Sequence, residues 1–300
     1  MITFLLIKEE YKNQNINIKS FYFRRALRIW PVYFLLFVVA LFILPNIPVF
    51  TLPQYGKSFV YSDLLSKTLL YGSLLPNLAS CFYFVPYLSH SWSIGSEEQF
   101  YLLWPLFLRK FQKHRVLKML IIIMLYNLIN YLLSQESFDI IPNRMAVYQF
   151  WNSFKIDSMS IGGIFAVILF NKNKLFRIVC NTAFFYLSLI AVLIFYFANI
   201  KFPYFHFTIY SVFFGIIIIN FAANSNLKLS LENRILIYLG KTSYGFYMYH
   251  PIAIVMTLYI CKEIGYLNNW LIYPFSFIIS LLFASISYKY IESFFLKFKT

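Results

Sequence analysis

The chain has 300 residues, of which 60% are hydrophobic, 22% are aromatic and only 12% are charged. A soluble domain carries about 25% charged residues, so this composition argues against a soluble enzyme and indicates a multi-pass membrane protein. The net charge of +15 would suggest nucleic-acid binding in a soluble protein, but basic residues also collect in the cytoplasmic loops of membrane proteins, and we expect no nucleic-acid partner.

A membrane-spanning helix needs about 20 mostly apolar residues, with about 17 tolerated. The first apolar segment, Met1–Ile7, is too short for the core of a signal peptide and resembles the tail of a hydrophobic helix whose beginning is absent. Eight predicted spans follow, at residues 29–45, 93–109, 116–134, 155–171, 178–199, 204–222, 243–261 and 270–291. The predicted fold is therefore all-α, a polytopic membrane helix bundle that forms one domain over 1–300.

A ninth apolar stretch, 64–78, contains Lys67, Gly72 and Pro76 and is ambiguous. Most of the 26 Lys and Arg residues lie in the segments 8–28, 109–118, 171–177, 223–241 and 292–300. If 64–78 does not cross the membrane, all five basic segments lie on one side, which the positive-inside rule assigns to the cytoplasm. We therefore expect 64–78 to be re-entrant or to lie on the surface, and both termini to be cytoplasmic.

The first polar pattern is "FYFRRALRIWPVY", residues 21–33, just before the first predicted span. Arg25 and Arg28 are three residues apart, so both can lie on one face of a helix. Two guanidinium groups there could bind the phosphates of a ligand from the cytosol. The alternative is a positive-inside anchor, with Trp30 and Tyr33 as interfacial aromatic residues.

The second pattern is "SHSWSIGSEEQFYLLWP", residues 89–105, at the outer end of its span. Glu97 and Glu98 are about 100° apart around a helix, so only one of them needs to face the bundle. The residues Ser93, Glu97, Tyr101 and Trp104 share one stripe. This mixture of a carboxylate, hydroxyls and an indole suits general-base chemistry or sugar binding. The alternative is that both acids only complement the helix dipole.

The third pattern, "GKTSYGFYMYHPI" at residues 240–252, places His250 inside a span and directly before Pro251. A histidine within the membrane normally faces the bundle interior and has a partner. The alternative is a neutral histidine that hydrogen-bonds the backbone group freed by the proline.

Two weaker patterns follow. In "FKIDSMSIGG", Lys155 and Asp157 lie at an outer helix mouth, and Gly162 and Gly163 allow close helix packing. In "SYKYIESFF", Glu292 lies at the inner end of the last span, where we expect a surface ion pair.

Taken together and in this order, the stretches "FRRALRIWPVY", "WSIGSEEQFYLLWP", "DSMSIGG", "SYGFYMYHP" and "SYKYIE" resemble the acyltransferase-3 family of integral membrane O-acyltransferases. The resemblance covers essentially the whole chain. It implies transfer of an acyl group, commonly acetyl from acetyl-CoA, to sugars of lipopolysaccharide, capsule, peptidoglycan, exported glycans or antibiotics. The family has about ten spans and an arginine pair, matched here by Arg25 and Arg28, that is taken to face the acyl donor.

The family also has an N-terminal span and most of another, with an arginine and a histidine regarded as catalytic. No residue here matches that histidine, so the resemblance describes a domain that lacks the N-terminal spans. Glu97 is then expected to support catalysis by orienting the histidine or binding the acceptor. The residues expected to line the site are Trp92, Ser93, Tyr101, Asp157 and His250.

The predicted function is that of a membrane-bound O-acyltransferase, located in the bacterial plasma membrane, with acetyl-CoA as the donor substrate and a carbohydrate or glycolipid as the acceptor. Membrane lipid is the other expected partner. No metal is expected, because the three cysteines are far apart and no metal-ligand spacing is present. Two alternatives remain, a transporter or flippase of glycan intermediates and an inactive remnant.

Overall fold

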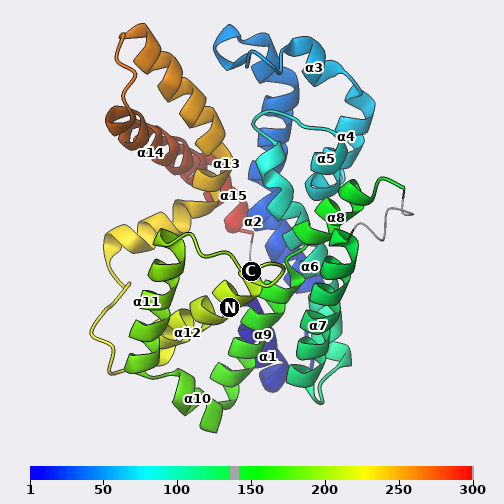
Figure 1. Ribbon diagram of the computed structural model, residues 1–300, viewed down its shortest axis with the longest axis vertical. Coiled ribbons are helices and arrows are strands. Elements are labelled where there is room, and N and C mark those ends of the chain that lie inside the picture. The colour runs from blue at the N-terminus through cyan, green and yellow to red at the C-terminus, as the bar shows by residue number, and fades with distance from the viewer. Residues whose placement is uncertain (136–141, 299–300) are drawn as a thin grey trace. The chain divides into compact units, whose positions relative to one another are not determined.

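The computed structural model describes residues 1–135 and 142–298. Apart from one isolated bridge between Leu52 and Tyr55, the regular elements in these ranges are helices (Figure 1). This confirms the all-α prediction. The end of the expected basic tail, 299–300, lies outside the described residues.

Five helical segments in the described residues are long and apolar enough to cross a membrane. They are Ile18–Asn46, Arg115–Ser134, Arg144–Asn171, His206–Ala223 and Asn269–Leu296. The other three predicted spans are also helical, as α6 (Trp92–Lys110), α11 (Thr182–Phe197) and α13 (Arg234–Glu263). Helix α11 has only 16 residues, whereas α6 and α13 contain most of the polar patterns described above. The total of eight spans stays a prediction, as does the cytoplasmic placement of both termini.

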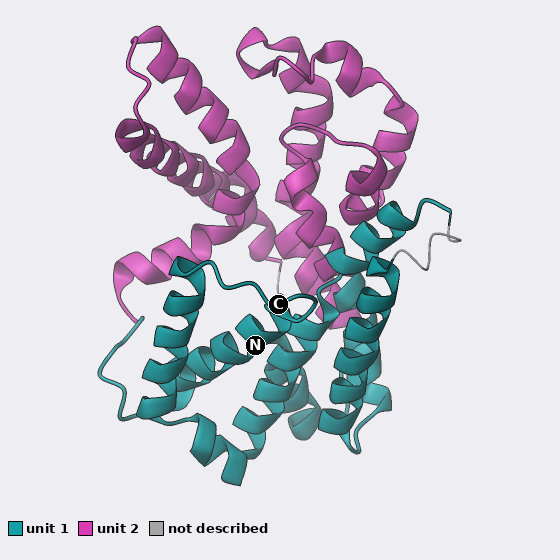
Figure 2. Cartoon of the chain, in the orientation of Figure 1, with its two compact units in different colours: residues 1–18, 99–231 teal, residues 19–98, 232–300 magenta. Residues whose placement is uncertain are grey.

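The chain divides into two compact units (Figure 2). Unit 1 consists of Met1–Ile18 and Gln99–Leu231, and unit 2 of Lys19–Glu98 and Glu232–Thr300. One of the three boundaries falls inside α6, between the two glutamates of the "EEQFY" sequence and the glutamine that follows them.

In unit 1, helix α9 (Ile156–Asn171) packs against α7 (Arg115–Ser134), α12 (His206–Ala223) and α1 (Ile2–Asn13). Close approach depends on glycine, because a Cβ at Gly163 would lie 2.8 Å from Cζ2 of Trp104. The Trp104 indole donates to Thr3 Oγ1 (2.9 Å). The shorter helices of the unit are α8 (Arg144–Ser153) and α10 (Lys174–Val179).

In unit 2, helix α13 packs along α14 (Asn269–Ser287), and a Cβ at Gly245 would lie 3.2 Å from the Ala284 Cα. The first long helix of this unit is α2 (Ile18–Val38), which continues as a π-helical turn, Val39–Ile43. After α14 the chain forms another π-helical turn, Tyr288–Glu292, and then α15 (Ser293–Leu296).

The ambiguous stretch 64–78 contains α4 (Leu64–Gly72) and the beginning of α5 (Pro76–Phe82). Neither helix alone is long enough to cross the hydrocarbon core. Lys67 is 2% exposed. Its amine donates to the carbonyls of Phe59 (2.7 Å) and Val60 (3.2 Å) at the end of α3 (Lys57–Tyr61). The lysine therefore supplies hydrogen bonds to carbonyls that a helix end leaves unpaired.

Candidate functional site

The two arginines of the first pattern lie on α2 in unit 2, and each has an electrostatic partner there. The Arg25 guanidinium lies over the Phe21 ring, 5.6 Å from its centroid, and interacts with the Glu98 carboxylate. The Arg28 guanidinium interacts with the Glu292 carboxylate. The arginines are therefore part of a charged cluster rather than isolated anchors at a helix end.

The glutamate that contacts α2 is Glu98. The Trp30 indole donates to Glu98 Oε2 (3.2 Å), while Oε1 is buried and has no hydrogen-bond partner within residues 1–135 and 142–298. The neighbouring Glu97 faces another part of unit 2, where it interacts electrostatically with Tyr247. The two acids therefore have different recorded neighbours, Trp30 and Arg25 for Glu98 and Tyr247 for Glu97.

Tyr247 joins α13 to the start of α6. Its hydroxyl lies 2.8 Å from Ser93 Oγ and donates to the His90 carbonyl. One turn earlier on α13, the Tyr244 hydroxyl donates to the Ile29 carbonyl of α2 (2.7 Å). These bonds connect three segments of unit 2 that are far apart in the sequence.

His250 makes the hydrogen bond to the backbone that was the alternative prediction for it. Its Nδ1 lies 2.6 Å from the Tyr247 carbonyl oxygen. In a regular helix that carbonyl would accept from the N–H of residue 251, but Pro251 has no N–H. The histidine therefore satisfies the carbonyl that the proline leaves free.

His90 lies beside His250, with ring centroids 5.1 Å apart and the planes at 79°. It belongs to the short 3₁₀ turn Ser89–Ser91, before α6 begins. Burial, and then the neighbouring His250, lower the pKa of His90 from 6.5 to about 4, so the ring is neutral at pH 7. Its Nε2 is buried and has no hydrogen-bond partner in the described part of the chain.

The expectation of a surface ion pair for Glu292 was wrong. Glu292 is 4% exposed and lies against α13, where a Cβ at Gly245 would be 3.1 Å from Glu292 Oε1. The π-helical turn Tyr288–Glu292 changes the direction of the side chains relative to a regular α-helix. Helical periodicity alone could not show this inward orientation.

Two residues expected to line the site lie in unit 1. Tyr101 follows the unit boundary on α6, one turn after Glu97. Asp157, in the first turn of α9, is 2% exposed and accepts from Thr208 Oγ1 (2.6 Å). Trp92 lies in unit 2 at the start of α6 and is 37% exposed. The other predicted site residues lie in unit 2. They are on α2, at the start of α6 and on α13.

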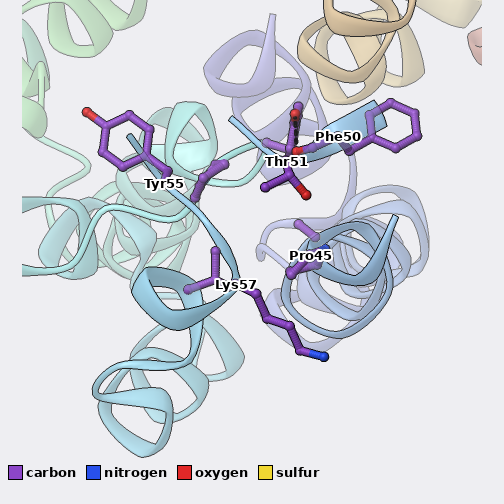
Figure 3. Close-up of a pocket in the computed structure, with 9 residues that line it drawn as sticks. Pro45, Phe50, Thr51, Tyr55 and Lys57 are labelled. Atoms are coloured by element: carbon purple, nitrogen blue, oxygen red, sulfur yellow. Dashed lines mark hydrogen bonds between the residues drawn. The ribbon is translucent and has the colours of Figure 1, made fainter. Parts of the chain in front are cut away.

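Unit 2 also has a pocket, which is lined by none of the site residues described above (Figure 3). Its cavity is about 10 Å³, roughly the space that one water molecule needs, so it is too small for a donor or a sugar. Lys57 is the one charged residue in its lining, which also includes Pro45, Phe50, Thr51 and Tyr55. We do not assign a substrate to it.

The site cluster is defined as Ser93, Glu97, Glu98, Tyr247, His90 and His250, together with Arg25 and Arg28. It combines cationic groups suited to phosphate with imidazole and hydroxyl groups suited to proton transfer. Neither the role of Tyr247 nor the pairing of His90 with His250 was predicted from the sequence. Within the described residues, no group of three or more His, Cys, Asp or Glu side chains is placed to hold a metal ion.

Comparison with known proteins gives consistent matches. The model of an acyltransferase domain, the acyltransferase-3 family, matches residues 1–289. The O-acetyltransferase OatA of Staphylococcus aureus (strain NCTC 8325 / PS 47) is 29% identical over 98% of this chain and 50% of its own length. The peptidoglycan O-acetyltransferase OatA of Listeria monocytogenes is 32% identical over 38% of this chain and 18% of its own length. The chain spans about half the length of the Staphylococcus aureus relative that it matches over nearly all of its own length. No solved structure shows significant similarity.

Proposed function

Because the chain belongs to the acyltransferase-3 family, we propose that it moves an acetyl group from acetyl-CoA to a hydroxyl of a cell-surface glycan. Family membership makes the chain an enzyme that transfers acyl groups, and its apolar helices make it a multi-pass protein of the cell membrane. The name of the Listeria monocytogenes relative makes peptidoglycan the first acceptor to test.

The observation that carries the proposal is the site cluster in unit 2. Charged and polar side chains within the helices of a membrane protein are costly, and where they occur they commonly mark a binding or transfer site. Here the Glu98 carboxylate accepts a hydrogen bond from the Trp30 indole. The Tyr247 hydroxyl donates to the His90 carbonyl and is hydrogen-bonded to the Ser93 hydroxyl. A site for acyl transfer needs groups of both kinds found here, cations for the donor's phosphates and polar groups for the acceptor hydroxyl.

Within the proposal, Arg25 and Arg28 bind the phosphates of the donor. Their spacing of three residues places them on one face of α2, and guanidinium groups can bind phosphate through paired hydrogen bonds. The carboxyl groups of Glu98 and Glu292 lie beside them, Glu98 near Arg25 and Glu292 near Arg28. Glu97, near Tyr247, is placed on the acceptor side of the cluster.

The donor site is tested with the purified chain in lipid nanodiscs, using radiolabelled acetyl-CoA and peptidoglycan that lacks O-acetyl groups. We expect Arg25→Ala or Arg28→Ala to weaken acetyl-CoA binding about tenfold or more, because each removes charge-assisted hydrogen bonds. Arg24→Ala is the matched control and should change the affinity less. Equal affinity in all three variants would return the pair to the role of membrane anchor, and glycan transport without acetyl-CoA consumption would favour a transporter.

The acceptor side is tested with the pair Glu97→Gln and Glu98→Gln. Both replacements remove a charge at nearly constant volume. We expect Glu97→Gln to slow acetyl transfer with little change in acetyl-CoA affinity. Glu98→Gln, which acts beside Arg25, should change acetyl-CoA affinity. Unchanged acetylation in Glu97→Gln at normal expression would remove Glu97 from the site.

A further inference from the structure

The tyrosines beside Glu98 donate their hydroxyl protons elsewhere. Tyr33 and Tyr244 both interact electrostatically with the Glu98 carboxyl group. The Tyr33 hydroxyl donates to the Tyr71 carbonyl (2.7 Å), and the Tyr244 hydroxyl donates to the Ile29 carbonyl (2.7 Å). A hydroxyl has one proton to donate, so neither tyrosine has one left for Glu98.

The Trp30 indole is therefore the group that fixes the orientation of Glu98. Its Nε1–H donates to Glu98 Oε2 (3.2 Å) from α2 to α6, while Oε1 is buried without a hydrogen-bond partner in residues 1–135 and 142–298. An indole only donates and has no charge of its own. It can thus hold one carboxyl oxygen without taking the place of a cationic partner.

The position of the indole is itself restrained. The Phe34 ring, one turn later on α2, lies 6.2 Å from the indole at an angle of 86°. The carbonyl of the preceding residue, Ile29, accepts from Tyr244 of α13. The following residue, Pro31, has a fixed φ. A rigid ring on a restrained stretch of backbone is suited to orienting another side chain.

Arg25 is the side chain that gains from an oriented Glu98. Its guanidinium interacts with the Glu98 carboxyl group and lies over the Phe21 ring, 5.6 Å from the centroid. An arginine side chain loses considerable rotamer entropy when a ligand immobilises it. A partner that restricts the guanidinium beforehand reduces this cost and strengthens binding.

We propose that Trp30 is a positioning residue of the donor site, which holds the Glu98 carboxyl group beside Arg25. The inference rests on the proposed function, in which Arg25 binds a phosphate of the donor. The effect of Trp30 on the donor passes through Glu98, which keeps the guanidinium in place for the phosphate. The competing explanation is that Trp30, which is 41% exposed, serves only as an interfacial anchor.

The experiment measures acetyl-CoA affinity and thermal unfolding for the purified chain in nanodiscs. Trp30→Phe keeps an aromatic ring and removes the N–H. We expect it to unfold near the wild-type temperature and to bind acetyl-CoA about tenfold more weakly, because hydrogen bonds to charged groups are among the stronger ones. Trp270→Phe is the matched control, since Trp270 is 89% exposed at the start of α14, and its affinity should equal that of the wild type. Wild-type affinity in Trp30→Phe, or an equal loss in Trp270→Phe, would overturn the proposal.

A double variant tests whether the effect passes through Glu98. Once Glu98→Ala has removed the carboxyl group, adding Trp30→Phe should change acetyl-CoA affinity by less than about twofold, because coupled residues are not additive. A further loss of about tenfold would overturn the proposal, since Trp30 would then act on the donor without Glu98. A wild type that binds no acetyl-CoA would overturn the proposed function as well.

Should Trp30→Phe fail to fold, the sulfur analogue of tryptophan provides a second variant. Trp30→benzothienylalanine keeps the shape of the indole and replaces its N–H by sulfur. We expect the same loss of acetyl-CoA affinity, about tenfold. Wild-type affinity in this variant would overturn the proposal.

Discussion

The most informative residue of the site is His90, a half-buried histidine whose Nε2 is buried and has no hydrogen-bond partner within the described residues. His90 is neutral because burial and the adjacent His250 oppose its protonation. Its pKa therefore affects the stability of the fold as well as the chemistry. Burial and the neighbouring His250 make protonation of the His90 ring costly in the folded chain.

The effect of His90 on stability has a definite sign. Its pKa is about 4 in the folded chain and 6.5 ordinarily, so between these values the unfolded chain binds the proton and the folded chain does not. The free energy of unfolding should then fall as the pH falls from about 6.5 to 4, by up to about 3 kcal/mol from this group. Thermal unfolding in detergent at several pH values checks this.

His90→Gln should flatten that pH dependence, because Gln does not titrate. His114→Asn is the control, since His114 is an exposed histidine with a left-handed backbone that Asn tolerates. An unchanged pH dependence in His90→Gln would show that His90 does not titrate as stated.

The sequence could predict which residue types carry the chemistry but not how each is oriented. The separation of Glu97 from Glu98 by about 100° follows from helix geometry, yet which of them contacts α2 depends on the position of Trp30. Glu292 was placed on the surface because a π-helical turn leaves no clear mark in the sequence. The bond from His250 to Tyr247 could be expected, because the proline identifies the free carbonyl in advance.

At the scale of elements, α9 shows how one face of a helix differs from the next. Gly162 and Gly163 were both expected to allow close packing. A Cβ at Gly163 would meet Trp104 at 2.8 Å and Met119 Sδ at 3.2 Å, whereas a Cβ at Gly162 would meet nothing within 4 Å. Of the two glycines, Gly163 is therefore the one that allows close packing within unit 1.

This difference predicts opposite effects for two adjacent substitutions. Gly163→Ala should lower the free energy of unfolding by about 1–3 kcal/mol, because the rigid indole of Trp104 has to move. Gly162→Ala should leave it unchanged or raise it by up to about 1 kcal/mol, since Ala favours the helix. Thermal unfolding of both proteins tests the pair, and equal effects would contradict the packing described for α9.

The end of α3 depends on a residue from the next helix. Lys67 donates to two α3 carbonyls and lies 3.3 Å from Ser62 Oγ. Lys67→Met would keep the length of the side chain but remove the side-chain donor to the Val60 carbonyl and leave the Phe59 carbonyl with only the Ser62 hydroxyl (2.8 Å), so we expect it to cost about 1–3 kcal/mol of unfolding free energy. Lys57→Met, at an exposed position of α3, should change stability by less than about 0.5 kcal/mol. A similar loss in both variants, measured by thermal unfolding, would remove the capping role of Lys67.

At the scale of the molecule, the positions of helices were predictable because hydrophobic length is a local property. All eight expected spans are helices in the structure. The division into two units was not predictable, because a boundary inside the continuous helix α6 has no linker composition to indicate it. Tyr101 and Asp157 belong to a different unit from His250, while the single domain over 1–300 stays a prediction.

The orientation of the whole chain in the membrane is predicted from charge. The basic segments 8–28, 109–118, 171–177, 223–241 and 292–300 lie on one side if 64–78 does not cross, and moving them outward is disfavoured. A fluorescent protein fused after residue 300 should therefore fluoresce in the cytoplasm, while alkaline phosphatase fused there should be inactive. Fusions after Lys201, in a predicted outer loop, should give the reverse result.

Two other outcomes of the fusion experiment would point to different errors. The predicted spans 204–222, 243–261 and 270–291 place residues 201 and 300 on opposite sides, because an odd number of crossings separates them. If the two fusions behave alike, one of these three segments does not cross as predicted. If both fusions give the opposite of the expected result, the error lies earlier in the chain. The stretch 64–78 is then the first to revise, because its crossing would reverse the side of every later loop while leaving residues 201 and 300 opposed.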